Sequence, residues 1–198
     1  MKIVCLDMEG VIAPEIWVEL ATKTGISELK RTTRDEPDYN ALMRYRLEIL
    51  YQNNIGMEAL QPIIKDIDPL PGAKVFIETL KKNYQVVILS DTFYEFVGPL
   101  MEKLGHPTLF CHKLEVDSEG KWFGYSLRMK DHKRSAVEAF KSLNFYTFAA
   151  GDSYNDTAML KEADVGVLFR PPLNVVQEFP QFDVVKEYDQ LLAKIEKC

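Results

Sequence analysis

The chain has 198 residues, of which 46% are apolar and 27% are charged, and its formal net charge is −6. This composition is typical of an ordinary globular protein that is long enough for one well-packed domain and a smaller subdomain. Basic residues are spread among acidic ones instead of being clustered, which argues against a nucleic-acid partner, because such proteins gather Lys and Arg to neutralise phosphates.

Short runs rich in β-branched residues alternate along the chain with helical patterns. The predicted strands cover residues 3–7, 86–91, 147–152 and 165–169. Each run is continuously apolar, as expected of a strand that is buried on both faces of a parallel sheet. Helical patterns near residues 75–80 and 135–143 predict an α/β fold with a doubly wound, Rossmann-like parallel sheet. Residues 117–120, between two alternating runs, predict a β-hairpin.

The segment after the first strand departs from this alternation. From residue 14 to residue 70 the pattern is helical, and no buried strand is evident. Its apolar residues recur at helical spacing, as at Ile16, Trp17 and Leu20, and such a stripe usually faces a core. We therefore expect a small helical cap domain over 14–70, inserted after the first strand, and an α/β core domain over 1–13 and 71–198.

Three predicted strands end in polar residues. Asp7 follows the first strand, Ser90 and Asp91 follow the second, and the run from Asp152 to Asp156 follows a later one. In an open α/β sheet, ligands bind outside the carboxyl ends of the strands. One Asp in such a place usually caps a helix. Polar residues at three strand ends, together with Lys133 just before a helix, instead favour one ligand site that they share.

The residue types at these strand ends suit phosphoryl transfer. Mg²⁺ prefers oxygen ligands and takes one or two carboxylates, for which Asp7 and Asp152 are the candidates. Ser90 and Lys133 could donate hydrogen bonds to phosphate oxygens. An Asp7 nucleophile would form an acyl phosphate, which divides one difficult displacement into two easier ones. Glu9 is the candidate that protonates the leaving alkoxide and deprotonates water.

Four motifs now stand in order along the chain: Asp7-Met8-Glu9-Gly10-Val11, Ser90, Lys133 and Gly151-Asp152-Ser153-Tyr154-Asn155-Asp156. This set resembles the motifs of the haloacid dehalogenase superfamily over essentially the whole chain. A helical insertion after the first motif resembles the cap of the phosphoserine phosphatase branch. Glu15-Ile16-Trp17 and residues 89–96 extend the similarity to bacterial members that also pass the phosphoryl group to homoserine.

The resemblance implies a Mg²⁺-dependent phosphoserine phosphatase that works through an aspartyl phosphate. Its small-molecule substrates would be phosphoserine and also homoserine, in serine and threonine biosynthesis. Asp7 would be the nucleophile and Glu9 the acid and base. Mg²⁺ would be held by Asp7, the backbone carbonyl of Glu9, and Asp152, while Asp156 would orient metal-bound water.

The remaining roles that the resemblance implies concern the substrate. The phosphate group would be surrounded by Ser90, Asp91, Lys133 and Asn155. Glu15 and Arg46, in or beside the cap, would bind the amino and carboxylate groups. Arg44 is the rival of Arg46, and Lys130 is the rival of Lys133, which opens the helix that leads to the last motif.

The other residues that could carry chemistry show no such pattern. The three cysteines, Cys5, Cys111 and Cys198, are too scattered for a disulfide scaffold or a CxxC metal site. His106, His112 and His132 have no ligand spacing, and we expect them to lie in loops or at the surface. With no leader sequence and no apolar run near ~18 residues, we expect a cytoplasmic protein without a membrane partner. The sequence leaves open whether it forms a homodimer.

Two alternative functions remain open at this point. One is a phosphatase of the same fold for another small phosphomonoester. The other is a non-enzymatic, receiver-like phosphoacceptor module, although such a module has no need of a substrate cap. A GxxxxGK[ST] phosphate loop is absent, so nothing supports an ATP-dependent kinase.

Glu9 generates a testable prediction, because the superfamily more often has Asp at this position. The extra methylene shifts the carboxyl oxygens by up to about 1.5 Å, which matters when catalytic placement must hold to ~0.5 Å. This shift would slow the attack of water on the phospho-enzyme and let an alcohol intercept it. Glu9→Asp should therefore raise phosphate release relative to phosphohomoserine formation. An unchanged ratio of the two products would refute the idea.

Overall fold

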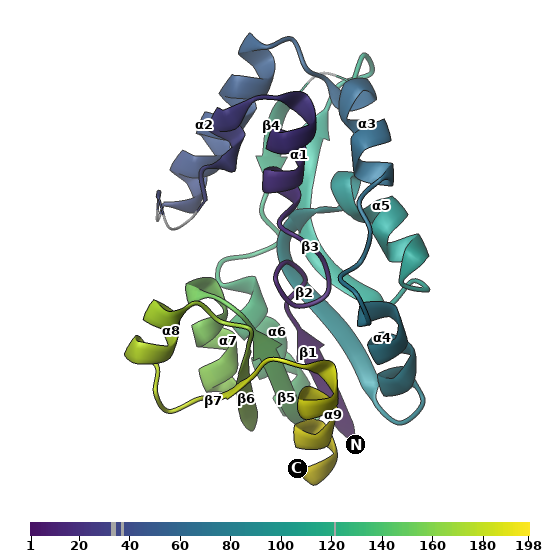
Figure 1. The fold of residues 1–198 in the computed structure, drawn as a ribbon, viewed down its shortest axis with the longest axis vertical. Coiled ribbons are helices and arrows are strands. Elements are labelled where there is room, and N and C mark those ends of the chain that lie inside the picture. Colours follow the sequence, from purple (N-terminus) through teal and green to yellow (C-terminus); the bar gives the residue numbers. More distant parts are fainter. Residues whose placement is uncertain (33–34, 37, 121) are drawn as a thin grey trace.

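A single seven-stranded sheet organises the fold of the computed structural model (Figure 1). The structure describes residues 1–32, 35–36, 38–120 and 122–198, with residues 122 and 123 described by their backbone alone. The strands are β1 (Lys2–Leu6), β2 (Gln85–Phe93), β3 (Thr108–Val116), β4 (Trp122–Ser126), β5 (Tyr146–Gly151), β6 (Val165–Phe169) and β7 (Asp183–Val185). Their spatial order is β4-β3-β2-β1-β5-β6-β7, and β4 alone is antiparallel to its neighbour.

Helices fill the connections between the strands. They are α1 (Ile16–Thr24), α2 (Tyr39–Gln52), α3 (Met57–Lys65), α4 (Ala73–Lys81), α5 (Tyr94–Lys103), α6 (His132–Ser142), α7 (Thr157–Glu162), α8 (Leu173–Glu178) and α9 (Tyr188–Lys197), with the 3₁₀ helices η1 (Ser27–Lys30) and η2 (Tyr154–Asp156). Among the described residues, no helix combines the length and the apolar composition needed to cross a membrane.

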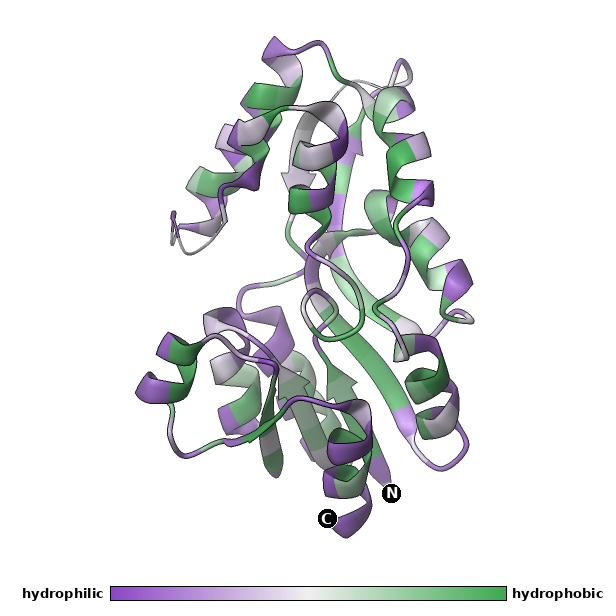
Figure 2. Ribbon diagram, in the orientation of Figure 1, coloured by the Kyte–Doolittle hydropathy of each residue, from purple (hydrophilic) through white to green (hydrophobic). Residues whose placement is uncertain are grey.

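The central strands are apolar on both faces, and Figure 2 shows them mostly in hydrophobic green. In β1, Val4 and Leu6 join the core under α4, α5 and α9, whereas Ile3 and Cys5 join the core under α6, α7 and α8. Successive side chains of a strand point to opposite faces, so a sheet covered by helices on both sides requires this continuous apolar pattern. The predicted doubly wound α/β fold is confirmed.

The predicted strands also lie where the sequence places them. The runs at 3–7, 86–91, 147–152 and 165–169 correspond to β1, β2, β5 and β6. The predicted hairpin is formed by β3 and β4, which pair antiparallel around the turn at 117–120. The short edge strand β7 has no counterpart among the predictions, because three residues give too little pattern to read.

Three helices follow β1 and lie beyond the carboxyl ends of the strands (Figure 1). They are α1, α2 and α3, and the β3–β4 hairpin extends alongside them. Hydrogen bonds connect this group to the hairpin: the Met57 backbone N–H donates to the Gly120 carbonyl (3.0 Å), and the Tyr125 hydroxyl donates to Asn40 (2.7 Å).

One continuous apolar cluster joins these helices to the sheet. It contains Leu20 of α1 and Leu60 of α3 together with Leu6 of β1 and Ile88 of β2, all of them fully buried. Trp17 of α1 packs edge-to-face on Phe96 of α5, with ring centroids 5.4 Å apart. This shared apolar cluster couples the folding of the three helices to that of the sheet, because unfolding of either one exposes apolar side chains of the other.

We therefore predict that Leu20→Ala destabilises the whole chain. Deleting this fully buried side chain should lower the free energy of unfolding by ~2–5 kcal/mol. Unfolding should stay a single transition when it is followed by far-UV circular dichroism and by Trp17 fluorescence in a Trp122→Phe background. Lys23→Ala, on the exposed face of the same helix, is the control and should change little. Separate transitions for the two signals would contradict this coupling.

Candidate active site

The second motif lies in an irregular part of β2. Leu89 pairs with Phe110 and Phe93 pairs with His112, so three residues of β2 stand opposite one residue of β3. Such a bulge interrupts the ladder and re-aims side chains, often beside active sites. Residues 90–92 occupy the bulge, and the Ser90 hydroxyl accepts a hydrogen bond from the backbone N–H of Thr92 (3.3 Å).

A tight turn presents the first motif. Asp7 follows the last residue of β1, and its backbone N–H donates to the Ala150 carbonyl of β5 (2.9 Å). Gly10 then adopts a φ of +79°, which favours glycine. A Cβ atom at Gly10 would lie 2.5 Å from the Asp152 carboxyl group. Glycine therefore allows the first and fourth motifs to approach each other.

The fourth motif, residues 151–156, is held by Asp156, which is fully buried. Its Oδ2 atom accepts hydrogen bonds from the backbone N–H groups of Asp152 (3.0 Å) and Ser153 (3.1 Å). A Cβ atom at Gly151 would lie 2.4 Å from the Asp156 side chain, so the glycine at that position leaves room for this carboxylate. Asp156 thereby fixes the loop that carries Asp152.

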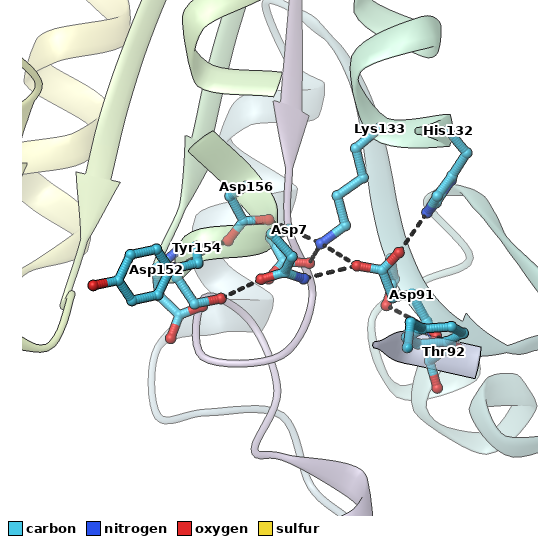
Figure 3. Close-up of polar contacts among 12 residues, drawn as sticks. Asp7, Asp91, Thr92, His132, Lys133, Asp152, Tyr154 and Asp156 are labelled. Atoms are coloured by element: carbon cyan, nitrogen blue, oxygen red, sulfur yellow. Dashed lines mark hydrogen bonds and ion pairs between the residues drawn. The ribbon is translucent and has the colours of Figure 1, made fainter. Parts of the chain in front are cut away.

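Lys133 of α6, the third motif, connects the other three motifs (Figure 3). Its Nζ lies 2.8 Å from Asp7 Oδ1, 2.8 Å from Asp156 Oδ1 and 3.1 Å from Asp91 Oδ2. The ammonium group is buried, yet its pKa lies well above the ordinary value. Burial lowers that pKa, but the carboxylates of Asp156, Asp7 and Asp91 outweigh the effect. Lys133 therefore remains charged.

These residues line a cavity of about 670 Å³ between the sheet edge and α1–α2. Its size is typical of a site for a small molecule. The described residues that line it are Asp7, Glu9, Glu15, Trp17, Thr32, Tyr39, Arg46, Ser90, Asp91, Thr92, Lys133, Asp152, Ser153, Tyr154, Asn155 and Asn174. Five of these side chains are carboxylates and two are cations, so the cavity carries an excess of acidic groups.

Three carboxylic acids of the cavity have raised pKa values. Burial, and then the Asp156 carboxylate, raises the pKa of Asp7 well above its ordinary value. Burial and the neighbouring Glu15 do the same to the pKa of Glu9. Burial and Asp156 raise the pKa of Asp152 to about 7. Each shift reflects a carboxylate that is buried beside other acidic groups.

The donor set at this edge fits a hard divalent cation. Oxygens of Asp7, Asp152 and Asp156 lie within 4.8 Å of one another. Both Asp156 oxygens already accept hydrogen bonds from Lys133 or from backbone N–H groups. Asp7 and Asp152 are therefore the carboxylates best able to face an ion, and an ion there would compensate the charge that raises their pKa values.

The other end of the cavity is formed from α1 and α2. Arg46 is 6% exposed; it stacks on the Trp17 ring (4.6 Å to the centroid) and donates to the Arg31 carbonyl (2.7 Å). Its Nε atom is buried and has no hydrogen-bond partner in the described part of the chain. Glu15, just before α1, lines the same cavity. Arg46 therefore has an unused donor for an anionic ligand.

The structure brings all ten predicted site residues together. Nine of them line the cavity, and Asp156 lies directly behind them. The alternative candidates Arg44 and Lys130 are exposed and do not line the cavity. Tyr39 lines the cavity without having been predicted, and its hydroxyl donates to the Asp91 carbonyl (2.6 Å).

The expectation for the histidines is wrong for two of the three. His106 is exposed, as expected. His112 and His132 are each 4% exposed and lie beside Asp91. His112 is buried because β3 pairs with the bulged end of β2, and His132 is buried because α6 starts against the same edge. Ligand spacing in the sequence could not reveal either contact.

Comparison with known proteins agrees with this geometry. The sequence pattern of haloacid dehalogenase-like hydrolases matches residues 1–164. The phosphoserine phosphatase ThrH of Pseudomonas aeruginosa is 56% identical over 198 residues, which are all of this chain and 97% of the relative. A phosphoserine phosphatase of Pseudomonas syringae pv. tomato is 54% identical over all of this chain and 84% of its own length. A solved structure of a phospho-aspartyl intermediate analogue of phosphoserine phosphatase has a TM-score of 0.79 at 24% identity, covers 98% of each chain and supports the fold.

The raised pKa of Asp152 predicts how stability changes with pH when no metal is present. An unfolded Asp loses its proton near pH ~4, whereas folded Asp152 keeps it until about pH 7. The folded state therefore binds more protons in this window, and its stability falls as the pH rises from ~4 to ~7. Asp7 and Glu9 act in the same direction.

Urea denaturation in EDTA across this pH range measures the effect. Asp152→Asn should flatten the fall in the free energy of unfolding, because the amide does not titrate. Asp189→Asn, an exposed substitution in α9, should keep the wild-type slope. A wild-type protein whose stability rises from pH ~4 to ~7 would contradict the assigned shifts.

Proposed function

The chain belongs to the haloacid dehalogenase-like hydrolase family, and from this premise we propose that it is a Mg²⁺-dependent phosphoserine phosphatase. The observation that carries the proposal is the position of Asp7. Its carboxylate lies beside the Lys133 ammonium (2.8 Å) in a cavity whose other end presents Arg46 and Glu15. A phosphate group at Asp7 and an amino-acid group at Arg46 would occupy the two ends together.

We propose that Asp7, Asp152 and the Glu9 backbone carbonyl hold the Mg²⁺ ion. Mg²⁺ suits this place because it prefers oxygen ligands and needs only one or two carboxylates beside its waters and a phosphate oxygen. When bound, the ion supplies positive charge that offsets the repulsion between the acidic cavity and an anionic substrate. Asp156 keeps Asp152 in place through the backbone of that loop.

In the first half of the reaction, an Asp7 oxygen attacks phosphorus and the bond from phosphorus to the serine oxygen breaks. Lys133, Ser90 and Asn155 lie where they can donate to the phosphoryl oxygens. The leaving alkoxide needs a proton, and Glu9 can supply it, because burial and Glu15 hold its pKa above the ordinary value. The products are serine and an acyl phosphate on Asp7.

In the second half, the phosphoryl group leaves Asp7. Ionised Glu9 takes a proton from water, whose oxygen attacks phosphorus, and the carboxylate of Asp7 is restored as phosphate is released. A hydroxyl of homoserine can take the place of water and yield phosphohomoserine. The cavity, at about 670 Å³, is larger than one phosphoserine molecule, which leaves space for an acceptor beside Asp7.

Residues 14–70 then act as a cap on a core formed by 1–13 and 71–198. The cap supplies Glu15, Tyr39 and Arg46 to the cavity, while the core supplies the carboxylates and Lys133. The same division places amino-acid recognition in the cap and phosphoryl chemistry in the core. A cytoplasmic location, where phosphorylated amino acids are made, is part of this proposal.

The test is an assay of phosphoserine with Mg²⁺, in the presence and absence of homoserine, with products identified by ³¹P NMR. We expect phosphate alone without homoserine and phosphohomoserine in addition when homoserine is present. Asp7→Asn should abolish both products. Turnover of other small phosphomonoesters in preference to phosphoserine would overturn the substrate, and the absence of any turnover would favour a phosphoacceptor module.

Arg46 provides a separate prediction about the substrate carboxylate. A charge-assisted hydrogen bond contributes ~1.5–3 kcal/mol, so Arg46→Ala should raise the KM for phosphoserine about 10- to 100-fold. Arg44→Ala, on the exposed side of the same helix, is the matched control and should behave like wild type. Phosphoethanolamine lacks the carboxylate, and its KM should be insensitive to Arg46→Ala. A normal KM for phosphoserine in Arg46→Ala would exclude the role.

A further inference from the structure

Asp91 has four nitrogen neighbours, two on each carboxylate oxygen. Its Oδ1 atom lies 3.0 Å from His132 Nε2 and 3.6 Å from His112 Nε2. Its Oδ2 atom accepts a hydrogen bond from Asn155 Nδ2 (2.7 Å) and lies 3.1 Å from Lys133 Nζ. One oxygen therefore faces two histidines, and the other faces two donors of the cavity.

The hydrogen bonds of His112 identify its tautomer. The backbone N–H of Arg128 donates to His112 Nδ1 (3.1 Å), so this nitrogen carries the lone pair. The proton of the neutral ring is then on Nε2, which points to Asp91. A ring nitrogen that carries a proton cannot ligate a metal. The group of Asp91 and two histidines is therefore a hydrogen-bonding cluster instead of a second metal site.

His132 presents its Nε2 atom to Asp91 (Figure 3). Its Nδ1 atom is buried, and within the described residues it has no hydrogen-bond partner. Burial lowers the pKa of His132, although Asp91 acts against this effect. A neutral ring has one N–H group, and placing it on Nε2 satisfies Asp91.

The environment explains why a carboxylate is tolerated beside a phosphate site. Burial acts to raise the pKa of Asp91, but Lys133 and the two histidines hold that pKa well below its ordinary value. Asp91 is thus ionised throughout the physiological range, and its charge is shared by surrounding donors. A negative charge at Asp91 does not attract phosphate. We therefore look for its role in the hydrogen-bond donors that contact Asp91 Oδ2.

Those donors are Lys133 and Asn155. The Lys133 ammonium is drawn toward Asp7 and Asp156 on one side, and Asp91 balances them from the other side. The Asn155 side chain is exposed and is held between Asp91 and the Ser153 hydroxyl. A fixed Asp91 carboxylate therefore helps to fix the position of both groups.

We propose that His112 and His132 are positioning residues, which hold the Asp91 carboxylate and through it aim Lys133 and Asn155 at the phosphoryl group. The inference rests on the proposed function for the identity of the phosphoryl site. His132 makes the closer contact and has the larger effect. His112 acts at 3.6 Å and has the smaller effect.

Three variants test the role of His132. His132→Ala should lower kcat/KM for phosphoserine about 10- to 100-fold, because misplacing a catalytic donor by ~1 Å can cost about 100-fold. His132→Gln should recover most of this loss, because its amide N–H can occupy the place of Nε2–H. His106→Gln, an exposed histidine, is the control and should match wild type. Thermal unfolding of each variant confirms that it is folded.

Ligand binding separates positioning from a general structural defect. Isothermal titration with inorganic phosphate should show weaker binding in His132→Ala, whereas inhibition by serine, which contacts the Arg46 end, should be unchanged. His112→Phe should weaken phosphate binding to a smaller degree. Equal loss of phosphate and serine binding in His132→Ala would overturn the proposal.

A double-mutant cycle tests whether His132 acts through Asp91. In an Asp91→Ala background, His132→Ala should cause little further loss of phosphate affinity, because the group it positions is gone. Independent, multiplying losses would overturn the inference. Phosphate binding is measured without turnover, so a wild-type protein that failed to hydrolyse phosphoserine would refute the proposed function and leave this test intact.

Discussion

The buried ammonium group of Lys133 is the interaction on which the site depends. It lies within 3.1 Å of Asp7, Asp91 and Asp156, which come from three different strand ends. Burying any one of these charges alone would be costly, and together they compensate one another. Removing the cation would leave three neighbouring carboxylates in repulsion. The same contact that stabilises the edge of the sheet thus places Asp7, the proposed nucleophile, beside Lys133, the proposed donor for the phosphate.

The backbone at each strand end is shaped to allow this convergence. Gly10 gives space for Asp152, Gly151 gives space for Asp156, and the bulge in β2 turns residues 90–92 toward the cavity. Parallel strands bring their carboxyl ends to one edge, which is why such distant residues meet. Burial, and then the acidic neighbours that result, raises the pKa values of Asp7, Glu9 and Asp152. This excess of acidic groups is the reason for proposing a bound cation beside Asp7 and Asp152.

Much of this could be predicted from the sequence, because the relevant signals are local. Continuous apolar runs identified β1, β2, β5 and β6, and polar residues at their ends identified the motifs. Lys133 could be chosen over Lys130 by its place at the start of a helix. In each case the residue lies within a few positions of a feature that the sequence itself displays.

The parts that escaped prediction depend on contacts between distant segments. His112 meets Asp91 because β3 pairs with a bulged strand, and that register has no signature in the sequence of either strand. Tyr39 reaches the Asp91 carbonyl from the first residue of α2, 52 positions away. An apolar or aromatic stripe in a helix predicts a buried face but does not identify what the face contacts.

The most direct test of the proposed role of Asp7 is to identify the atom that carries the phosphoryl group during turnover. Rapid acid quenching after mixing with ³²P-labelled phosphoserine and Mg²⁺, followed by peptide mapping, locates the label. We expect a hydroxylamine-sensitive acyl phosphate on the peptide that contains Asp7, and we expect none in Asp7→Asn. Steady turnover with label on another residue, or with no protein-bound label at any quench time, would contradict it.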